Sequence, residues 1–179
     1  MPIIRFIKKV DRGQKMSNFF SMRTIEWRDG EVHLIDQTKL PEKLSYVKYS
    51  EYEQIGDCIK NMVVRGAPAI GVAAAMGLGL AALKSKAKSE NELLNDLKKA
   101  ARKLESTRPT AVNLFWATSR ILRVAEERGD DVESTIDAVI NEAKKMADED
   151  FETNLKIGKN GAELLEDKDV VLTHCKWPR

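Results

Sequence analysis

The feature that most constrains this chain is its longest uncharged run, which lies between Arg65 and Lys84. The run is near the lower length limit of a membrane span, but it is rich in Ala and Gly and lacks the Leu and Phe bulk of membrane helices. Pro68 fits the first turn of a helix. A helix that is apolar all round is typical of a protein core. We therefore predict a buried helix here and no membrane partner.

Apolar side chains recur at helical spacing on both sides of this run. Ser50 is expected to be an N-cap, because Glu53 follows three residues later, and Thr110 is expected to cap a later helix. Gly158 and Gly161 are expected to loosen the chain beyond the last long helix. The predicted helices are residues 50–62, 68–84, a helix that begins at Ser89, 110–128 and 132–155, with Leu164 and Leu165 closing a short further helix.

Short strands are expected before the helices, and one more after them. Residues 24–27 and 32–35 predict a hairpin, because Asp29-Gly30 suits a type I′ turn, and residues 44–49 alternate like a third strand. Residues 169–173 are typical of a buried strand in a parallel sheet that is covered on both faces. A single strand of this kind cannot bury itself. Either it pairs with the N-terminal strands or the rest of its sheet is missing, and we favour the second interpretation.

Composition narrows the class of protein. The chain is 42% hydrophobic and 32% charged, which supports a core and argues against disorder. The net charge is +2 and basic residues are interleaved with acidic ones, so nucleic acid is not an expected partner. The two cysteines make no disulfide framework, the N-terminus lacks a signal-peptide pattern, and the His and Cys residues have no metal-ligand spacing. We expect a cytoplasmic protein without a bound metal.

Two arginines each precede a proline-led helix start. Arg65, Gly66 and Ala67 form one junction, and Arg108 begins the other. A helix start offers free N–H groups and the positive end of the helix dipole to an anion. Gly66 lets a phosphate approach the backbone, and an Arg can pair with that phosphate through two hydrogen bonds. The two junctions could converge on one phosphorylated ligand, but an ordinary capped turn would also explain each of them.

The cysteines and a glycine motif give weaker signals. Cys175 stands at the carboxyl end of the predicted strand, where open α/β sheets bind ligands, and its thiol could be a nucleophile, an acid or base, or an anion stabiliser. The alternative is a buried small hydrophobe, which is also the expected role of Cys58. Residues 77–82 match a dinucleotide fingerprint, but no strand precedes them, so we expect close helix packing there instead.

Together these motifs resemble the methylthioribose-1-phosphate isomerase family. The likeness runs from about Met22 to Cys175. It is carried by residues 22–27 (MRTIEW), 34–41 (LIDQTKLP), 65–71 (RGAPAIG), 107–114 (TRPTAVNL) and 172–175 (LTHC). That family interconverts 5-methylthioribose 1-phosphate and 5-methylthioribulose 1-phosphate in methionine salvage. Related domains occur in the exchange-factor subunits of translation initiation.

The resemblance implies a fold, a site and partners. The fold class is α+β: small N-terminal antiparallel strands followed by a helical bundle, ending in the first strand of a truncated Rossmann-like domain. The expected divisions are residues 1–21 as an extension, 22–167 as the N-terminal domain and 168–179 as the start of the Rossmann-like domain. Arg65, Gly66, Ala67 and Arg108 would bind the sugar-phosphate substrate, and Cys175 would assist at the reacting carbons. No cofactor is implied, and members of the family are typically homodimers.

Departures from the family limit what this chain is expected to do. Lys176-Trp177-Pro178-Arg179 stands where the family has Asn and small residues, and the proton-donor aspartate of the family has no counterpart in this sequence. We therefore expect no isomerase activity from this chain alone. The alternatives are the ribose-1,5-bisphosphate isomerase branch, a non-catalytic interaction module like those of the initiation factors, and a helical remnant that does nothing.

Overall fold

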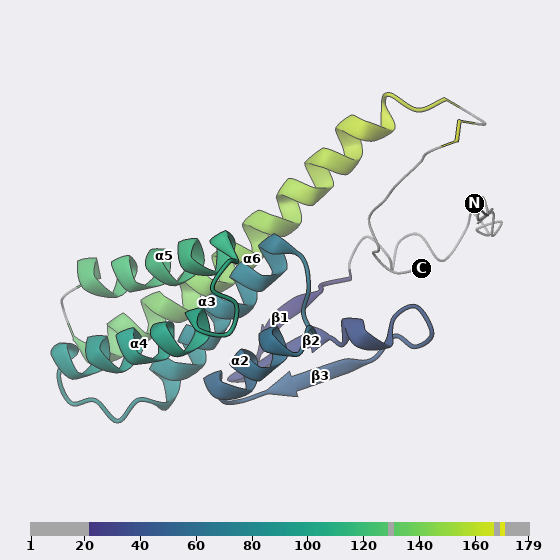
Figure 1. The fold of residues 1–179 in the computed structure, drawn as a ribbon. Helices are drawn as coiled ribbons and strands as arrows, with labels where there is room; N and C mark the ends of the chain where they lie inside the picture. The colour runs from purple at the N-terminus through teal and green to yellow at the C-terminus, as the bar shows by residue number, and fades with distance from the viewer. Residues whose placement is uncertain (1–21, 129–130, 167–168, 171–179) are drawn as a thin grey trace.

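The computed structural model describes residues 22–128, 131–166 and 169–170. Within these residues an antiparallel sheet of three strands is followed by five α-helices (Figure 1). In chain order the elements are β1 (Ile25–Arg28), β2 (Glu31–Ile35), the 3-10 helix η1 (Gln37–Lys39), β3 (Tyr46–Tyr49), α2 (Tyr52–Lys60), α3 (Ala67–Lys84), α4 (Glu90–Glu105), α5 (Val112–Arg128) and α6 (Val132–Ala162). The predicted succession of strands and a helical bundle is confirmed.

The sheet has the order β1-β2-β3, and both pairs are antiparallel. Asp29 and Gly30 have φ angles of 49° and 77°, the pair of positive values that a type I′ hairpin turn requires. The predicted hairpin is therefore confirmed. The third strand begins at Tyr46, two residues later than predicted, and Leu44 is exposed.

The uncharged helix α3 is the centre of the bundle, since it packs against α2, α4, α5, α6 and the sheet. Among the described residues it is also the one helix long and apolar enough to cross a membrane, and 72% of it is buried inside the fold. Its glycines permit close packing: a Cβ on Gly79 would lie 3.0 Å from the Trp27 ring, and one on Gly77 would lie 3.3 Å from Ile55. The predicted buried helix and its close packing are confirmed.

Helix α6 is much longer than its neighbours, and its second half projects beyond the bundle (Figure 1). Its first half is buried against α3 and α5, but beyond Phe151 the side chains are exposed, including Ile157 at 64%. The prediction that Gly158 and Gly161 loosen the chain is wrong, because the helix continues to Ala162. Each glycine costs only about 1 kcal/mol of helix propensity, which neighbouring helical residues offset.

Two helix starts differ from the prediction. The N-cap of α2 is Glu51 rather than Ser50. The Gln54 side chain accepts hydrogen bonds from the main-chain N–H groups of Ser50 and Glu51, each at 3.1 Å. Helix α5 begins at Val112, and the turn before it is closed by the main chain of Arg108 rather than by the Thr110 side chain. The predicted cap at Ser89 is confirmed, since its hydroxyl accepts from the N–H of Glu92.

The end of the described chain does not form the predicted elements. Leu164 and Leu165 lie in a turn, not in a short further helix. Asp169 and Val170 are not in a strand, because the main-chain N–H of Asp169 donates to the carbonyl of Glu166. The rest of the predicted strand, the start of the Rossmann-like domain and the extension at residues 1–21 lie outside the described residues.

Candidate functional site

The start of α3 has the backbone geometry of an anion site. Gly66 is the N-cap and has a φ of 98°, which residues with a Cβ rarely adopt. Its carbonyl accepts from the N–H of Ile70 at 2.9 Å, which is the first bond of the helix. Arg65, Gly66 and Ala67 are all exposed. The first N–H groups of α3 therefore open onto the surface, together with the positive end of its dipole.

Arg65 is tied to a distant part of the chain. Its Nη2 donates to the main-chain carbonyl of Gln37 in η1 at 2.8 Å. Gln37 is buried, and its own N–H donates to the carbonyl of Val63 at 3.0 Å. This contact fixes one edge of the guanidinium and leaves its other N–H groups for a ligand. A planar guanidinium held in this way loses less conformational freedom when it binds an anion.

The start of α5 lies against the start of α3. A Cβ on Gly71, in the second turn of α3, would lie 3.0 Å from the Asn113 carbonyl oxygen and 3.5 Å from the Cβ of Ala117. Arg108, which is half-buried, precedes α5 and accepts a main-chain hydrogen bond from Ala111 at 3.0 Å. Figure 1 shows both helix starts at the end of the bundle from which α6 projects.

The structure therefore brings the two predicted junctions to one end of the bundle. The convergence of the Arg65 and Arg108 guanidinium groups on one ligand stays a prediction. Cys175 lies outside the described residues, and its predicted role also stays a prediction. What the described residues offer chemically is cationic and N–H groups that bind and orient an anion.

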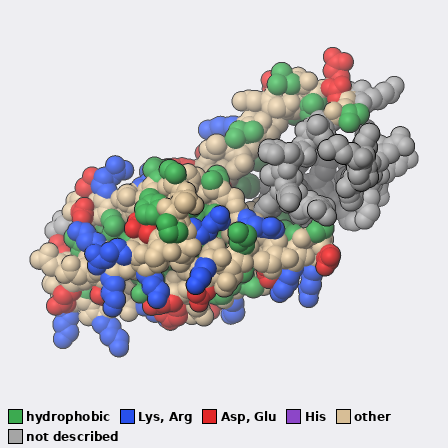
Figure 2. Space-filling model, in the orientation of Figure 1, with side chains coloured by type: hydrophobic (Ala, Val, Ile, Leu, Met, Phe, Trp, Pro, Cys, Tyr) green, Lys and Arg blue, Asp and Glu red, His purple; other side chains and the backbone are tan. Residues whose placement is uncertain are grey.

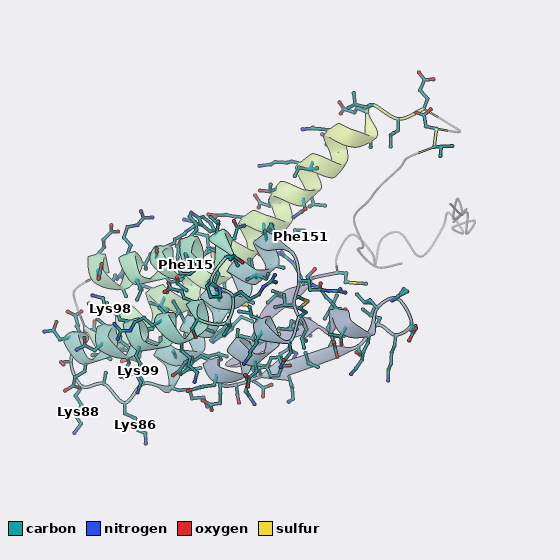
Figure 3. The ribbon with its side chains drawn as sticks, in the orientation of Figure 1. Lys86, Lys88, Lys98, Lys99, Phe115 and Phe151 are labelled. Carbon is teal, nitrogen blue, oxygen red and sulfur yellow. The ribbon has the colours of Figure 1, made fainter. Side chains whose placement is uncertain are left out.

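A cavity of about 230 Å³ adjoins this end of the bundle, between β1, α3 and α6. Its apolar lining is Ile25, Ala69, Val72, Ala147 and Phe151, with Met22 at its edge. Figure 3 shows Phe151 on α6 close to the start of α3. No local sequence pattern predicts this cavity, because it is assembled from three elements far apart in the chain.

Polar side chains that line the same cavity already have interaction partners. Arg23 stacks over the Phe151 ring, 3.9 Å from its centroid, and its Nη2 lies 3.0 Å from Asp148. Asn154 donates to the Asp150 carboxylate at 3.1 Å. Burial raises the pKa of Asp150 above its ordinary value, and the Asn154 hydrogen bond only partly opposes this. The four-residue spacing of Asp150 and Asn154 on a helix was the sequence signal that could have drawn attention to them.

Cys58 has the structural role that the sequence predicts. It is 2% exposed within the core, and burial raises the pKa of its thiol to about 12, so that it carries no thiolate at neutral pH.

No group of His, Cys, Asp and Glu residues within the described part of the chain could hold a metal ion. Figure 2 shows Lys and Arg side chains interleaved with Asp and Glu over the face of the bundle in view.

The fold defines a class: a strand-plus-helix domain in which two Arg-led helix starts lie at one end of the bundle. The model of the initiation factor 2 subunit family matches residues 63–177. This match spans more than half of the chain, and the chain belongs to that family. The predicted resemblance is thereby confirmed.

Known relatives carry three different names. A 5-deoxyribose 1-phosphate isomerase from Moorella thermoacetica is 49% identical over 152 residues, which are 84% of this chain and 43% of that protein. The crystal structure of 5-methylthioribose 1-phosphate isomerase from Pyrococcus horikoshii aligns with a TM-score of 0.76 and 48% identity, over 80% of this chain and 40% of that one. The crystal structure of translation initiation factor eIF-2B, subunit delta, from A. fulgidus aligns with a TM-score of 0.79 and 51% identity, over 87% of this chain and 45% of that one.

These alignments confirm the fold class over the part that they cover. The chain spans less than half the length of the curated relatives that it matches. The activity of a whole relative is therefore a matter for proposal in this chain.

Proposed function

We propose that this chain forms the phosphate-binding part of an aldose–ketose isomerase that acts on 5-methylthioribose 1-phosphate. One observation carries the proposal: an exposed, glycine-capped helix start stands beside an arginine that is anchored at one edge, with a second Arg-led helix start packed against it. The name of the P. horikoshii structure supplies the substrate. In this proposal Arg65, Arg108 and the first N–H groups of α3 bind the phosphate.

The chemistry separates binding from turnover. In the reaction the ring bond between C1 and O4 breaks, C1 gains a hydrogen that C2 loses, C2 becomes the carbonyl carbon, and O4 takes the proton of the C2 hydroxyl. This transfer needs an acid or base beside both carbons, which typically contributes about 10²–10⁴-fold. Guanidinium groups orient the phosphate but do not shuttle protons at neutral pH. We therefore expect this chain alone to bind the substrate without turning it over.

Binding of 5-methylthioribose 1-phosphate to the purified chain, measured by calorimetry, tests the proposal. Arg65→Gln removes charge-assisted hydrogen bonds to the phosphate and should weaken binding by about 10- to 100-fold. Arg123→Gln is the matched control, because Arg123 on α5 is exposed and lies 4.0 Å from Glu127 only. The control should bind like the unchanged chain. Equal affinities of the Arg65 and Arg123 variants would contradict the phosphate site.

A second candidate is a non-catalytic interaction module, which the name of the A. fulgidus structure favours. Exposed apolar side chains at the start of α5 are consistent with a protein partner, since Val112 is 78% and Trp116 54% exposed. A pull-down that yields one stoichiometric protein partner, together with no sugar-phosphate binding by calorimetry, would favour this function over the isomerase.

The remaining expectations belong to the same proposal. We propose a homodimeric, cytoplasmic full-length protein that needs no cofactor and binds neither nucleic acid nor membrane. The sugar phosphates named for the relatives support the substrate class alone. The ribose-1,5-bisphosphate branch stays an alternative, and the cavity beside α3 bears on that choice.

A further inference from the structure

The cavity between β1, α3 and α6 lies within one helical turn of the proposed phosphate site. Ala69 lines the cavity and is the third residue of α3, so at 1.5 Å per residue it lies about 3 Å along the helix axis from Ala67. Helix α6 carries Phe151 past the same end of the bundle (Figure 3). A sugar whose phosphate is bound at the start of α3 is therefore long enough to reach this cavity.

The walls of the cavity suit an apolar group. Ile25 and Val72 are buried side chains of the core, and Phe151 presents an aromatic ring. Arg23 lies over this ring, so the guanidinium is already occupied by a cation–π contact and by Asp148. A thioether next to an aromatic ring makes a favourable contact, which an alkyl group of the same size makes less well.

The charges around the cavity disfavour a second anion. Asp150 lines the cavity, and Asp148, which is not part of the lining, is the ion partner of Arg23. A 5-phosphate placed here would meet the Asp150 carboxylate and would compete with Asp148 for Arg23. The Asp150 carboxylate, which accepts from Asn154, is instead suited to a sugar hydroxyl.

We propose that this cavity receives the 5-methylthio group of the sugar phosphate, so that Ala147 and Phe151 on α6 determine which substituent at C5 the site accepts. The inference rests on the proposed phosphate site at the start of α3. It names the substituent that the site selects: a small apolar thioether in preference to hydrogen or to phosphate. The same residues then separate a methylthioribose site from a bisphosphate site.

A ligand series on the unchanged 179-residue chain tests this inference by calorimetry. The ligands are 5-methylthioribose 1-phosphate, 5-deoxyribose 1-phosphate, ribose 1,5-bisphosphate and inorganic phosphate. The methylthio compound should bind about tenfold or more tightly than the deoxy compound, because one small apolar group in a fitting pocket is worth about that factor. The bisphosphate should bind more weakly than the methylthio compound.

A pair of variants locates the effect. Ala147→Leu on α6 fills part of the cavity away from the start of α3. It should remove the preference for the methylthio group while leaving the affinity for inorganic phosphate within about twofold. Ala162→Leu adds the same side chain at the exposed end of α6 and should leave the preference unchanged. Melting temperatures report whether either variant folds, and the ligand series decides the matter if Ala147→Leu does not.

The outcomes separate this inference from the proposed function. Equal affinity for the three sugar phosphates, or a methylthio preference that survives in a folded Ala147→Leu chain, would overturn the cavity as the selecting site while phosphate binding stands. Absence of binding by every ligand, inorganic phosphate included, would overturn the proposed function and the cavity proposal with it.

Discussion

Arg65 shows how a single side chain can join the two halves of the domain. Its guanidinium donates to the Gln37 carbonyl in η1, although the two residues are 28 positions apart. The Gln37 side chain is buried, and neither its Nε2 nor its Oε1 has a hydrogen-bond partner among the described residues. Such a buried amide is costly. Gln37 therefore contributes through its main chain, which holds both Arg65 and the loop at Val63.

Gly71 is the residue on which the approach of α3 to α5 depends. We predict that Gly71→Ala destabilises the domain by about 1–2 kcal/mol, because the new Cβ would press on the Asn113 carbonyl at 3.0 Å. Gly158→Ala is the same change in a helix with nothing within 4 Å, and it should stabilise by up to about 1 kcal/mol. Urea unfolding of both variants checks this. Two shifts of the same sign would contradict the close approach.

At the scale of elements, one arginine on α5 forms hydrogen bonds to α6. Arg120 on α5 donates to Glu142 at 2.6 Å and through two nitrogens to Glu149 at 2.7 and 2.9 Å, and its side chain is only 15% exposed. Its guanidinium also lies 5.5 Å from the Trp116 ring. Arg120 hydrogen-bonds to Glu149 and thereby lowers the pKa of that carboxyl. This pair fixes how α6 lies along α5 before it leaves the bundle.

We predict that Arg120→Met destabilises the domain by about 1–3 kcal/mol at neutral pH, because the largely buried Glu142 loses its hydrogen bond from Arg120 and keeps only the longer contact of 4.0 Å with Lys145. Arg123→Met on the same helix should change stability by less than about 0.5 kcal/mol. The pKa of Glu149 is lowered by folding, so its contribution exists above the unfolded pKa and is lost as the pH falls through the folded value. The difference between the Arg120 variant and the unchanged chain should therefore shrink in acid. A difference that is constant with pH, measured by urea unfolding, would contradict the clamp.

At the scale of the whole molecule, local patterns predict the elements but not the places where they meet. The uncharged run and the Asp29-Gly30 turn predict α3 and the hairpin, because periodicity and turn chemistry are properties of neighbouring residues. The contact of Arg65 with Gln37 depends on tertiary packing, which no local pattern encodes. The cavity is a product of the same packing of distant elements. The prediction that Gly158 loosens the chain was wrong for a different reason, since an isolated glycine does not end a long helix.

The contrast between α3 and the outer half of α6 predicts uneven protection of the backbone. Hydrogen exchange of residues 70–82 should be the slowest in the chain, because α3 is enclosed on all sides. Residues 155–162 should exchange much faster, because an exposed helical segment of this length is marginal alone. Mass spectrometry of the exchanged peptides checks this, and equal protection of the two segments would show that the outer half of α6 is covered in solution.

The central claim is that two neighbouring helix starts hold one phosphate, and a double-mutant cycle at Arg65 and Arg108 tests it most directly. The affinity for 5-methylthioribose 1-phosphate is measured for the unchanged chain, Arg65→Gln, Arg108→Gln and the double variant. If both guanidinium groups bind the same phosphate, each single change weakens binding about tenfold or more, and the double variant loses less than the product of the two. A double loss equal to that product, or a single variant that binds normally, would mean that the two arginines do not share a ligand.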